Sequence, residues 1–333
     1  MKIVIATPLY PPEIGGPATY AKLLFEGLPK KGIEVDLVKF SDVQYLPKII
    51  RHFAYYRRVL KAAKNADVVL ALDPVSVGLP AMKAAQKARK PFVVKIVGDY
   101  AWEQGQQRFG ITQNLDEFIK MNNVPFPVRI LRRIQVRVAR SSTRIIVPSE
   151  YLKGIVTAWG IPKEKIRVIY NGIELPAHVP THQKNDGEFL IVSAGRCVPW
   201  KGFEAIERVA QGHANWRVFI ASGLPRAETL GWIKAADVFV LNSRYEGFSH
   251  TLIEAMTLGT PIIATDAGGN KSLVGETGLL IPSENDTALQ EALTIVANNP
   301  VAARERAQAA QKRMNLFSLP QMLDSTAVLL KSL

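Results

Sequence analysis

Two glutamates, Glu246 and Glu254, stand eight positions apart in a segment with an ordered set of structural signals. Apolar runs at residues 238–241 and 261–264 flank the segment, which predicts two buried strands of a parallel sheet. Between the strands, apolar residues recur at near-helical spacing up to Gly259. Glu254 is therefore expected inside a helix, and Glu246 in the loop that precedes it.

The expected start of this helix can bind an anion. Ser249 or Thr251 is a plausible N-cap, with His250 between them, so unpaired backbone amides and the positive end of the helix dipole lie near residues 249–251. The two carboxylates on either side can accept hydrogen bonds from hydroxyl groups. An anion flanked by hydroxyl-rich groups describes a sugar nucleotide.

A pair of basic residues, Arg196 and Lys201, lies between an expected strand at 189–194 and an expected helix at 203–210. A planar guanidinium and a mobile ammonium five residues apart can hold a diphosphate from two sides. Cys197 lies between them, and we interpret it as a loop residue rather than a nucleophile.

The pattern E-x7-E from Glu246 to Glu254, continued by EAM-x-x-G-T-P-I-I-A-T-x-x-G-G, resembles the donor-site signature of the retaining GT-B glycosyltransferases of family 4. The resemblance implies that Glu254 holds the ribose hydroxyls and Glu246 the transferred sugar. It also assigns the diphosphate to Arg196, Lys201 and the amides near residues 249–251. The alternative reading is a plain helix covering a sheet, with two solvated glutamates.

The Gly15-Gly16 pair follows an expected strand at 2–7 and precedes a helix expected at 19–28. The G-x-G-x-x-G spacing of a dinucleotide fingerprint is absent. Glycines here permit close approach of the backbone to a ligand. In the family that the chain resembles, such a loop reaches toward the donor phosphate and the acceptor, so we predict both glycines as donor-binding residues; a structural loop is the alternative.

Asp99 follows an expected strand at 92–97, at the edge of the sheet where ligands bind in such folds. The resembling family commonly has a histidine near this position, facing the donor sugar, and this chain has Gly98-Asp99 instead. We predict Asp99 as a catalytic residue that takes over this role, with a turn-forming aspartate as the alternative.

A chain of 333 residues is long enough for two domains. Strands alternate with helices throughout, which predicts an α/β protein; as the resemblance implies, two Rossmann-like doubly wound domains face each other across a cleft. The second domain is shortened, because only about forty residues separate Arg196 from Asp237, and this leaves the nucleotide base unassigned. The expected boundaries are 1–174 for the acceptor-side domain, 175–187 for a linker, 188–318 for the donor domain and 319–333 for a C-terminal helix that can cross back to the first domain.

Positive charge is concentrated in the first half of the chain. Residues 1–175 carry 28 Lys and Arg against 14 Asp and Glu, whereas residues 176–333 carry 14 against 15. Two amphipathic, basic helices are expected at 45–64 and 127–144. They predict either an ordinary solvated surface or a face that docks on anionic lipid. Nothing resembles a nucleic-acid-binding module.

A single cysteine fits a reducing compartment, and the first residues lead directly into a strand without a secretory signal. No run reaches the roughly 18 apolar residues that span a bilayer. We therefore expect a cytoplasmic protein that can be peripheral at the inner face of the membrane.

Together these features predict a retaining, metal-independent hexosyltransferase of glycan biosynthesis. It would move a sugar from a nucleoside diphosphate sugar to a lipid-linked, glycan or small-molecule acceptor. No cofactor is expected besides the donor substrate, and no Asp-x-Asp pair suggests a metal site. The alternatives are a non-catalytic member that binds a nucleotide sugar or a partner, and a sugar-nucleotide epimerase or hydrolase.

Overall fold

The structure is a computed structural model that describes residues 1–13 and 15–333, apart from the side chains of Lys48 and Ile49. The chain forms two compact units. The first comprises Met1–Asn171 together with Leu319–Leu333, and the second comprises Gly172–Ser318. Residues 175–187 belong to the second unit.

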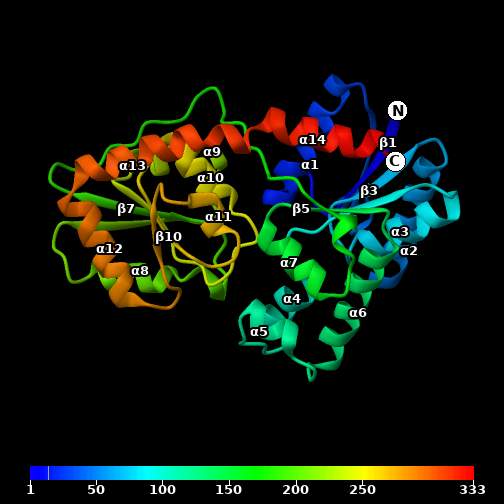
Figure 1. The fold of residues 1–333 in the computed structure, drawn as a ribbon, viewed down its shortest axis with the longest axis horizontal. Helices are drawn as coiled ribbons and strands as arrows, with labels where there is room; N and C mark the ends of the chain where they lie inside the picture. The colour runs from blue at the N-terminus through cyan, green and yellow to red at the C-terminus, as the bar shows by residue number, and fades with distance from the viewer. Residues whose placement is uncertain (14) are drawn as a thin grey trace. The chain divides into compact units, whose positions relative to one another are not determined.

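The first unit is built on a six-stranded parallel sheet in the order β2-β1-β3-β4-β5-β6 (Figure 1). Its strands are β1 Lys2–Thr7, β2 Glu34–Lys39, β3 Val68–Ala71, β4 Phe92–Lys95, β5 Arg144–Val147 and β6 Ile166–Val168. All residues of β3 and β4 are buried, as their continuous apolar sequences require. Strand β2 lies on one side of β1, and strands β3 to β6 follow on its other side. This is the arrangement of a doubly wound sheet.

Eight α-helices lie in the described part of the first unit. They are α1 Gly16–Gly27, α2 Lys48–Ala63, α3 Gly78–Ala88, α4 Tyr100–Arg108, α5 Leu115–Lys120, α6 Phe126–Ser141, α7 Glu150–Ala158 and α14 Leu319–Lys331. Short 3-10 turns occur at Pro29–Lys31, Phe40–Val43 and Lys163–Lys165.

Two helix boundaries differ from the sequence-based prediction for local reasons. Helix α1 begins at Gly16 rather than at residue 19, because Gly15 serves as its N-cap and a proline fits the first turn. Helix α6 ends at Ser141 rather than at Arg144. The hydroxyl of Ser142 donates to the carbonyl of Ala139 at 2.7 Å and closes the end of the helix.

The last helix, α14, completes the hydrophobic core of the first unit. Leu323 and Leu330 are buried in one cluster with Leu24 of α1 and with residues of the sheet. A side chain at Gly27 would overlap Leu323, so the glycine allows α1 and α14 to pack closely. The final segment of the chain is therefore part of the first folding unit.

The second unit has a five-stranded parallel sheet in the order β11-β10-β9-β7-β8. Its strands are β7 Phe189–Ala194, β8 Trp216–Ala221, β9 Val238–Leu241, β10 Ile262–Thr265 and β11 Leu279–Ile281. Its helices are α8 Phe203–Ala210, α9 Arg226–Ala235, α10 His250–Leu258, α11 Asn270–Val274, α12 Asp286–Asn298 and α13 Pro300–Arg313, with 3-10 turns at Pro199–Lys201 and Met314–Phe317. A single helix, α9, connects β8 to β9. The predicted α/β class with two parallel sheets is confirmed.

Candidate functional site

The predicted site residues of the second unit follow strands that end at one edge of the sheet. Strand β7 lies beside β9, and β9 lies beside β10, all in parallel. Their carboxyl ends therefore meet, and the loops that follow them carry Lys201, Glu246 and the Gly268-Gly269 pair. This edge is where parallel α/β sheets bind their ligands.

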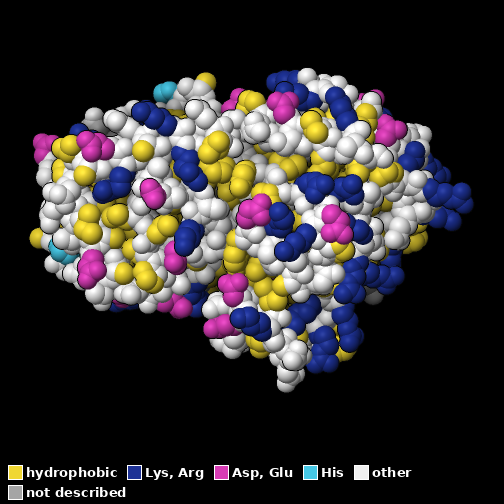
Figure 2. Space-filling model, in the orientation of Figure 1, with side chains coloured by type: hydrophobic (Ala, Val, Ile, Leu, Met, Phe, Trp, Pro, Cys, Tyr) yellow, Lys and Arg dark blue, Asp and Glu magenta, His cyan; other side chains and the backbone are white. Residues whose placement is uncertain are grey.

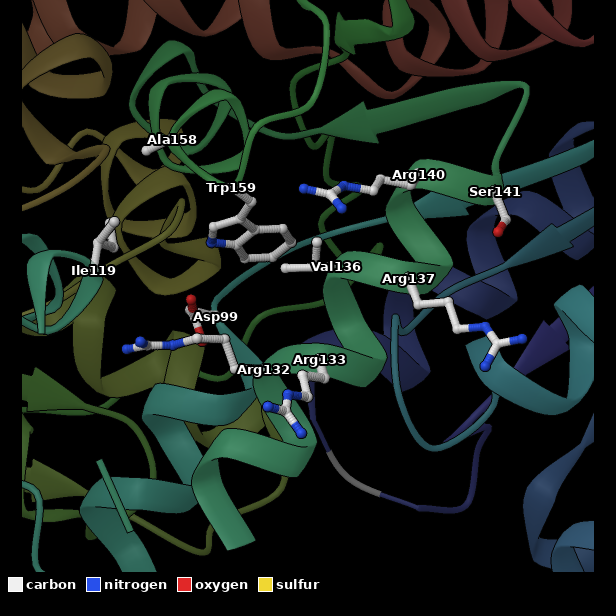
Figure 3. Close-up of a pocket in the computed structure, with 10 residues that line it drawn as sticks. All are labelled: Asp99, Ile119, Arg132, Arg133, Val136, Arg137, Arg140, Ser141, Ala158 and Trp159. Carbon is white, nitrogen blue, oxygen red and sulfur yellow. The ribbon is translucent and has the colours of Figure 1, made fainter. Parts of the chain in front are cut away.

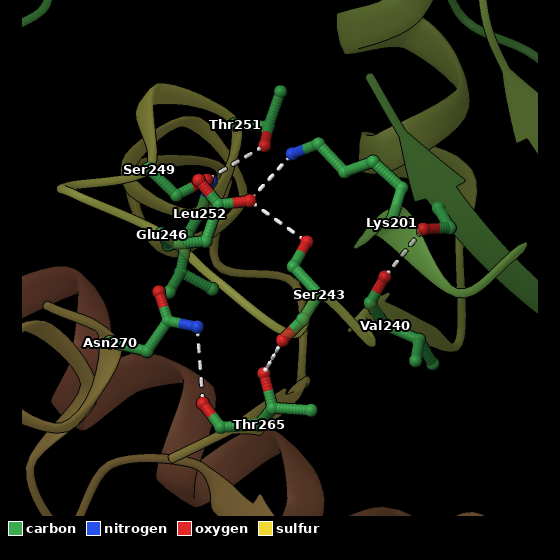
Figure 4. Close-up of polar contacts among 10 residues, drawn as sticks. Lys201, Val240, Ser243, Glu246, Ser249, Thr251, Leu252, Thr265 and Asn270 are labelled. Carbon is green, nitrogen blue, oxygen red and sulfur yellow. Dashed lines mark hydrogen bonds and ion pairs between the residues drawn. The ribbon is translucent and has the colours of Figure 1, made fainter. Parts of the chain in front are cut away.

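Lys201 and Glu246 form the centre of the site. The Lys201 ammonium lies 2.5 Å from Glu246 Oε1, and the Ser243 hydroxyl donates to the same oxygen at 2.8 Å (Figure 4). The side chains of Lys201 and Glu246 are only 14% and 13% exposed. Sequence reasoning missed Ser243, although its position directly after β9 is a signal for a site residue. The structure thus brings together one predicted diphosphate ligand and one predicted catalytic residue.

The glycine pair fixes the backbone of Glu246. The Gly269 N–H donates to the carbonyl of Glu246 at 2.8 Å. Gly268 has a φ of 62°, and a Cβ at this position would overlap the same carbonyl oxygen. Only glycine combines this backbone conformation with so close an approach. The loop after β10 therefore supports the loop after β9 at the residue expected to contact the sugar.

Helix α10 begins beside this cluster, with Ser249 as its N-cap and His250 as its first residue. The Ser249 hydroxyl accepts from the backbone N–H of Leu252 at 3.3 Å and lies 3.0 Å from the hydroxyl of Thr251. Of the two predicted caps, Ser249 is the one that the structure uses. The start of α10 also presents the positive end of the helix dipole, which attracts an anion.

Glu254 lies within α10, buried to 6% exposure, and forms a separate ion pair. Its Oε1 accepts from Arg226 Nε at 2.7 Å, and Arg226 also donates to the carbonyl of Glu174 at 2.9 Å. Burial raises the pKa of the Glu254 carboxyl, and the charge of Arg226 opposes this rise. Sequence reasoning missed Arg226, although it begins the helix that follows β8 at the same edge of the sheet.

Arg196 is the residue of the predicted basic pair that lies exposed. Its side chain makes no hydrogen bond or ion pair with residues that the structure describes. Cys197 is exposed as well, with its sulfur 3.3 Å from the Ser222 hydroxyl. Within residues 1–13 and 15–333, no group of three or more His, Cys, Asp and Glu could hold a metal ion.

Asp99, Gly15 and Gly16 belong to the first unit, and the other predicted site residues belong to the second. Asp99 is 1% exposed and caps α4 by accepting from the N–H of Trp102 at 2.9 Å. Burial raises the pKa of Asp99, and the hydrogen bonds that it accepts and the charge of Arg132 oppose this rise. Gly15 caps α1 and Gly16 starts it.

Two family models match the chain. The model described as Glycosyltransferase Family 4 matches residues 14–176, and the model described as Glycosyl transferases group 1 matches residues 206–314. The chain is 25% identical to an uncharacterised glycosyltransferase of Methanocaldococcus jannaschii, covering 82% of this chain and 83% of that protein.

Solved structures share the fold over the whole chain. Sucrose-phosphate synthase from Thermosynechococcus elongatus superposes with a TM-score of 0.79 at 18% identity, covering 99% of this chain and 98% of that one. Anabaena HepE in complex with UDP and glucose gives a TM-score of 0.74 at 17% identity, covering 100% of this chain and 99% of that one. These structures show that the chain has the GT-B fold. With the two family models, the chain belongs to glycosyltransferase family 4.

Proposed function

We propose that this glycosyltransferase transfers a hexose from a nucleoside diphosphate sugar with retention of the anomeric configuration. The observation that carries the proposal is the Lys201–Glu246–Ser243 cluster at the carboxyl edge of the second sheet, with the unpaired Arg196 in the same connection between β7 and α8 as Lys201. Retention rests on the E-x7-E resemblance. The HepE structure was solved with UDP and glucose, which supports a nucleoside diphosphate sugar as the donor class.

Positive charge around the leaving group supplies the catalytic effect in this proposal. Arg196, Lys201 and the amides at the start of α10 would hold the diphosphate, whose negative charge grows as the bond to the sugar breaks. Preorganised donors stabilise such charge most in the transition state. Lys201 is paired with Glu246, so a donor phosphate would share this lysine. Glu254 would bind the ribose hydroxyls. These groups provide the charge that a metal would otherwise supply, so we propose metal-independent transfer.

Transfer is tested with the purified protein, a panel of UDP-, GDP- and ADP-sugars, and glycan, lipid-linked and small-molecule acceptors. The expected result is a glycoside with the anomeric configuration of the donor, seen by proton NMR, at a rate unchanged by EDTA. An inverted product would contradict retention, and loss of the rate in EDTA would contradict metal independence. Donor binding without turnover on any acceptor would favour a non-catalytic role, and conversion of donor alone would indicate an epimerase or a hydrolase.

The acceptor is proposed to reach the enzyme at an anionic membrane surface through the first unit. Helix α3 packs between α2 and α6, and none of these three helices contains an Asp or Glu. Lys and Arg gather over them in the lower right of Figure 2. Phe53 of α2 and Phe126 of α6 are 60% and 68% exposed, which suits insertion between lipid head groups. In the part of the chain that is described, no helix is long and apolar enough to cross a membrane.

Sedimentation with vesicles tests this membrane proposal. The protein should sediment with vesicles that contain anionic phospholipid at low salt and be released as salt rises, because screening weakens the attraction. Phe53→Ser with Phe126→Ser should weaken sedimentation, whereas Val301→Ser, an equally exposed apolar residue of the second unit, should not. Absence of sedimentation at low salt would refute the proposal.

A further inference from the structure

The first unit contains a cavity of about 500 Å³ that the proposed donor chemistry does not use. It is bordered by α6, by α5 and by the end of α7. Ile119, Val136 and Trp159 form much of its apolar wall, and Trp159 is 9% exposed. Figure 3 shows the indole of Trp159 beside Val136, with arginines leaving α6 around them. The cavity therefore combines an aromatic wall with a cationic border.

Three of these arginines are unpaired. Arg133, Arg137 and Arg140 stand at positions i, i+4 and i+7 of α6, which places them along one face of the helix. All three are exposed, and none makes a side-chain hydrogen bond or ion pair with the described residues. In Figure 3 Arg140 extends toward Trp159, while Arg133 and Arg137 point outward. Three like charges repel one another, so a site that gathers them favours an anionic ligand.

The fourth arginine of the cavity has a structural role. Arg132 donates to the carbonyls of Met121 and Phe118 at 2.7 and 2.8 Å, and it lies 4.3 Å from the centre of the Phe118 ring. It also lies beside Asp99, whose carboxylate accepts from the Trp102 N–H. Asp99 and Arg132 offset each other in charge, so the three unpaired arginines determine the net charge that a ligand meets.

We propose that this cavity binds a phosphate monoester or diester, with the organic part of the ligand against Trp159 and the phosphoryl group bound by Arg140, while Arg133 and Arg137 add positive charge along the same face of α6. Guanidinium groups bind phosphate oxygens in pairs of parallel hydrogen bonds. An indole face accommodates a sugar ring or another apolar surface. A soluble sugar phosphate and the head group of a phospholipid present the same chemistry. The site lies within the first unit and requires none of the donor-binding residues of the second.

The Trp159 indole provides a local measurement. In the ¹⁵N-labelled full-length protein, the Trp159 indole N–H resonance is assigned with Trp159→Phe and followed during titration with glucose 6-phosphate or with monomeric dihexanoyl phosphatidic acid. We expect a saturable shift of this resonance with at least one of the two ligands, and the ligand that gives it identifies the source of the phosphate. Binding at the second unit would instead shift Trp200, which precedes Lys201.

Charge-removal variants complete the test. The combined substitution Arg133→Ala, Arg137→Ala and Arg140→Ala should raise the Kd by about tenfold or more. Its matched control removes the same charge from exposed positions of the second unit through Lys234→Ala, Arg304→Ala and Lys312→Ala. The control should keep the Kd within about twofold. If the triple α6 variant does not fold by circular dichroism, Arg140→Gln alone should still raise the Kd. No saturable Trp159 shift with either ligand, or an equal loss in both triple variants, would overturn the proposal.

Discussion

At the scale of single residues, the pair of Lys201 and Glu246 is the most informative contact of the second unit. Both side chains are largely buried, at 14% and 13% exposure, and Ser243 supports the carboxylate. An ion pair of this kind adds little to stability when its desolvation is counted. The more important effect of the pair is to fix the conformation of the Lys201 side chain. The pair holds the ammonium group at the edge of the sheet where a phosphate is expected.

Lys201→Ala should therefore reduce turnover much more than stability. We expect kcat to fall by about 10²–10³-fold, the usual cost of removing one donor to a developing negative charge. The measurement is initial-rate kinetics, with thermal unfolding of the same samples. Lys234→Ala removes an exposed lysine of α9 and should change neither quantity. A large fall in Tm for Lys201→Ala, with kcat retained in the folded fraction, would show a structural role.

The pair of Arg226 and Glu254 predicts a dependence of stability on pH. Burial raises the pKa of Glu254 above its usual 4.5, so the folded state binds this proton more tightly than the unfolded chain. The contribution of Glu254 to stability therefore falls as pH rises from about 4.5 through the folded-state pKa. Arg226 reduces this loss because it stabilises the carboxylate.

In Arg226→Ala the carboxylate loses its partner, and the pKa of Glu254 should rise further. The Tm deficit relative to the wild type should be larger at pH 7.5 than at pH 4.5, measured by differential scanning calorimetry. The double variant Arg226→Ala with Glu254→Gln is the control, because it lacks the titrating group and should show a deficit that is constant with pH. A constant deficit in the single variant would contradict the assigned pKa shift.

Several residues of the site could be predicted from the sequence, and others could not. Glu246, Glu254 and Lys201 could be predicted because they belong to motifs with a recognisable spacing. The structure adds their ion pairs. Arg226 and Ser243 belong to no recognisable motif. Their roles arise from contacts between loops that are distant in the chain. The burial of Asp99 as a helix cap likewise depends on the packing of α6, which no local pattern specifies.

At the scale of elements, the loop after β10 acts as a support for the loop after β9. Gly268 has a positive φ and lies against the Glu246 carbonyl, and Gly269 donates to the same carbonyl. The position of the Glu246 side chain therefore depends on a glycine 22 residues further along the chain. The sequence predicted the strands and the helix around Glu246, but the contact between these two loops is seen only in the structure.

The substitution Gly268→Ala tests whether the loop after β10 holds Glu246 in place. A non-glycine residue at positive φ costs about 1–2 kcal/mol, and here the Cβ would also overlap the Glu246 carbonyl. We expect the free energy of unfolding to fall by more than this amount and kcat to fall as Glu246 moves, measured by urea denaturation and by kinetics. Gly187→Ala is the matched control, because Gly187 has a φ of 79° and no neighbour within 4 Å. Equal effects of the two substitutions would show that the close contact is unimportant.

At the scale of the whole chain, the α/β class could be predicted because the strands are apolar runs separated by amphipathic helices, whereas the order of the strands in each sheet comes from the structure. The residues of β1, β7 and β9 were predicted with the bounds that the structure has. Helix ends were less predictable, as α1 and α6 show, because caps are set by single side chains and by backbone conformation. The membership of α14 in the first core follows from tertiary packing rather than from any local signal.

The contribution of α14 can be measured with two substitutions on one helix. Leu330 is fully buried in the first core, whereas Val328 is 70% exposed. Leu330→Ala should lower the free energy of unfolding by about 2–5 kcal/mol, because it leaves a cavity. Val328→Ala should change it by less than about 0.5 kcal/mol. Chemical denaturation of the full chain provides both values, and a small effect of Leu330→Ala would contradict the packing of α14 in this core.

The central claim is that the edge of the second sheet binds a nucleoside diphosphate sugar through Glu254 and its neighbours. Isothermal titration calorimetry with UDP-, GDP- and ADP-sugars tests it most directly, on the wild type and on Glu254→Ala. We predict saturable binding of at least one nucleotide series to the wild type, and a loss of about 1.5–3 kcal/mol of binding free energy in the variant. Binding of no nucleotide sugar, or equal affinity in the two proteins, would contradict the claim.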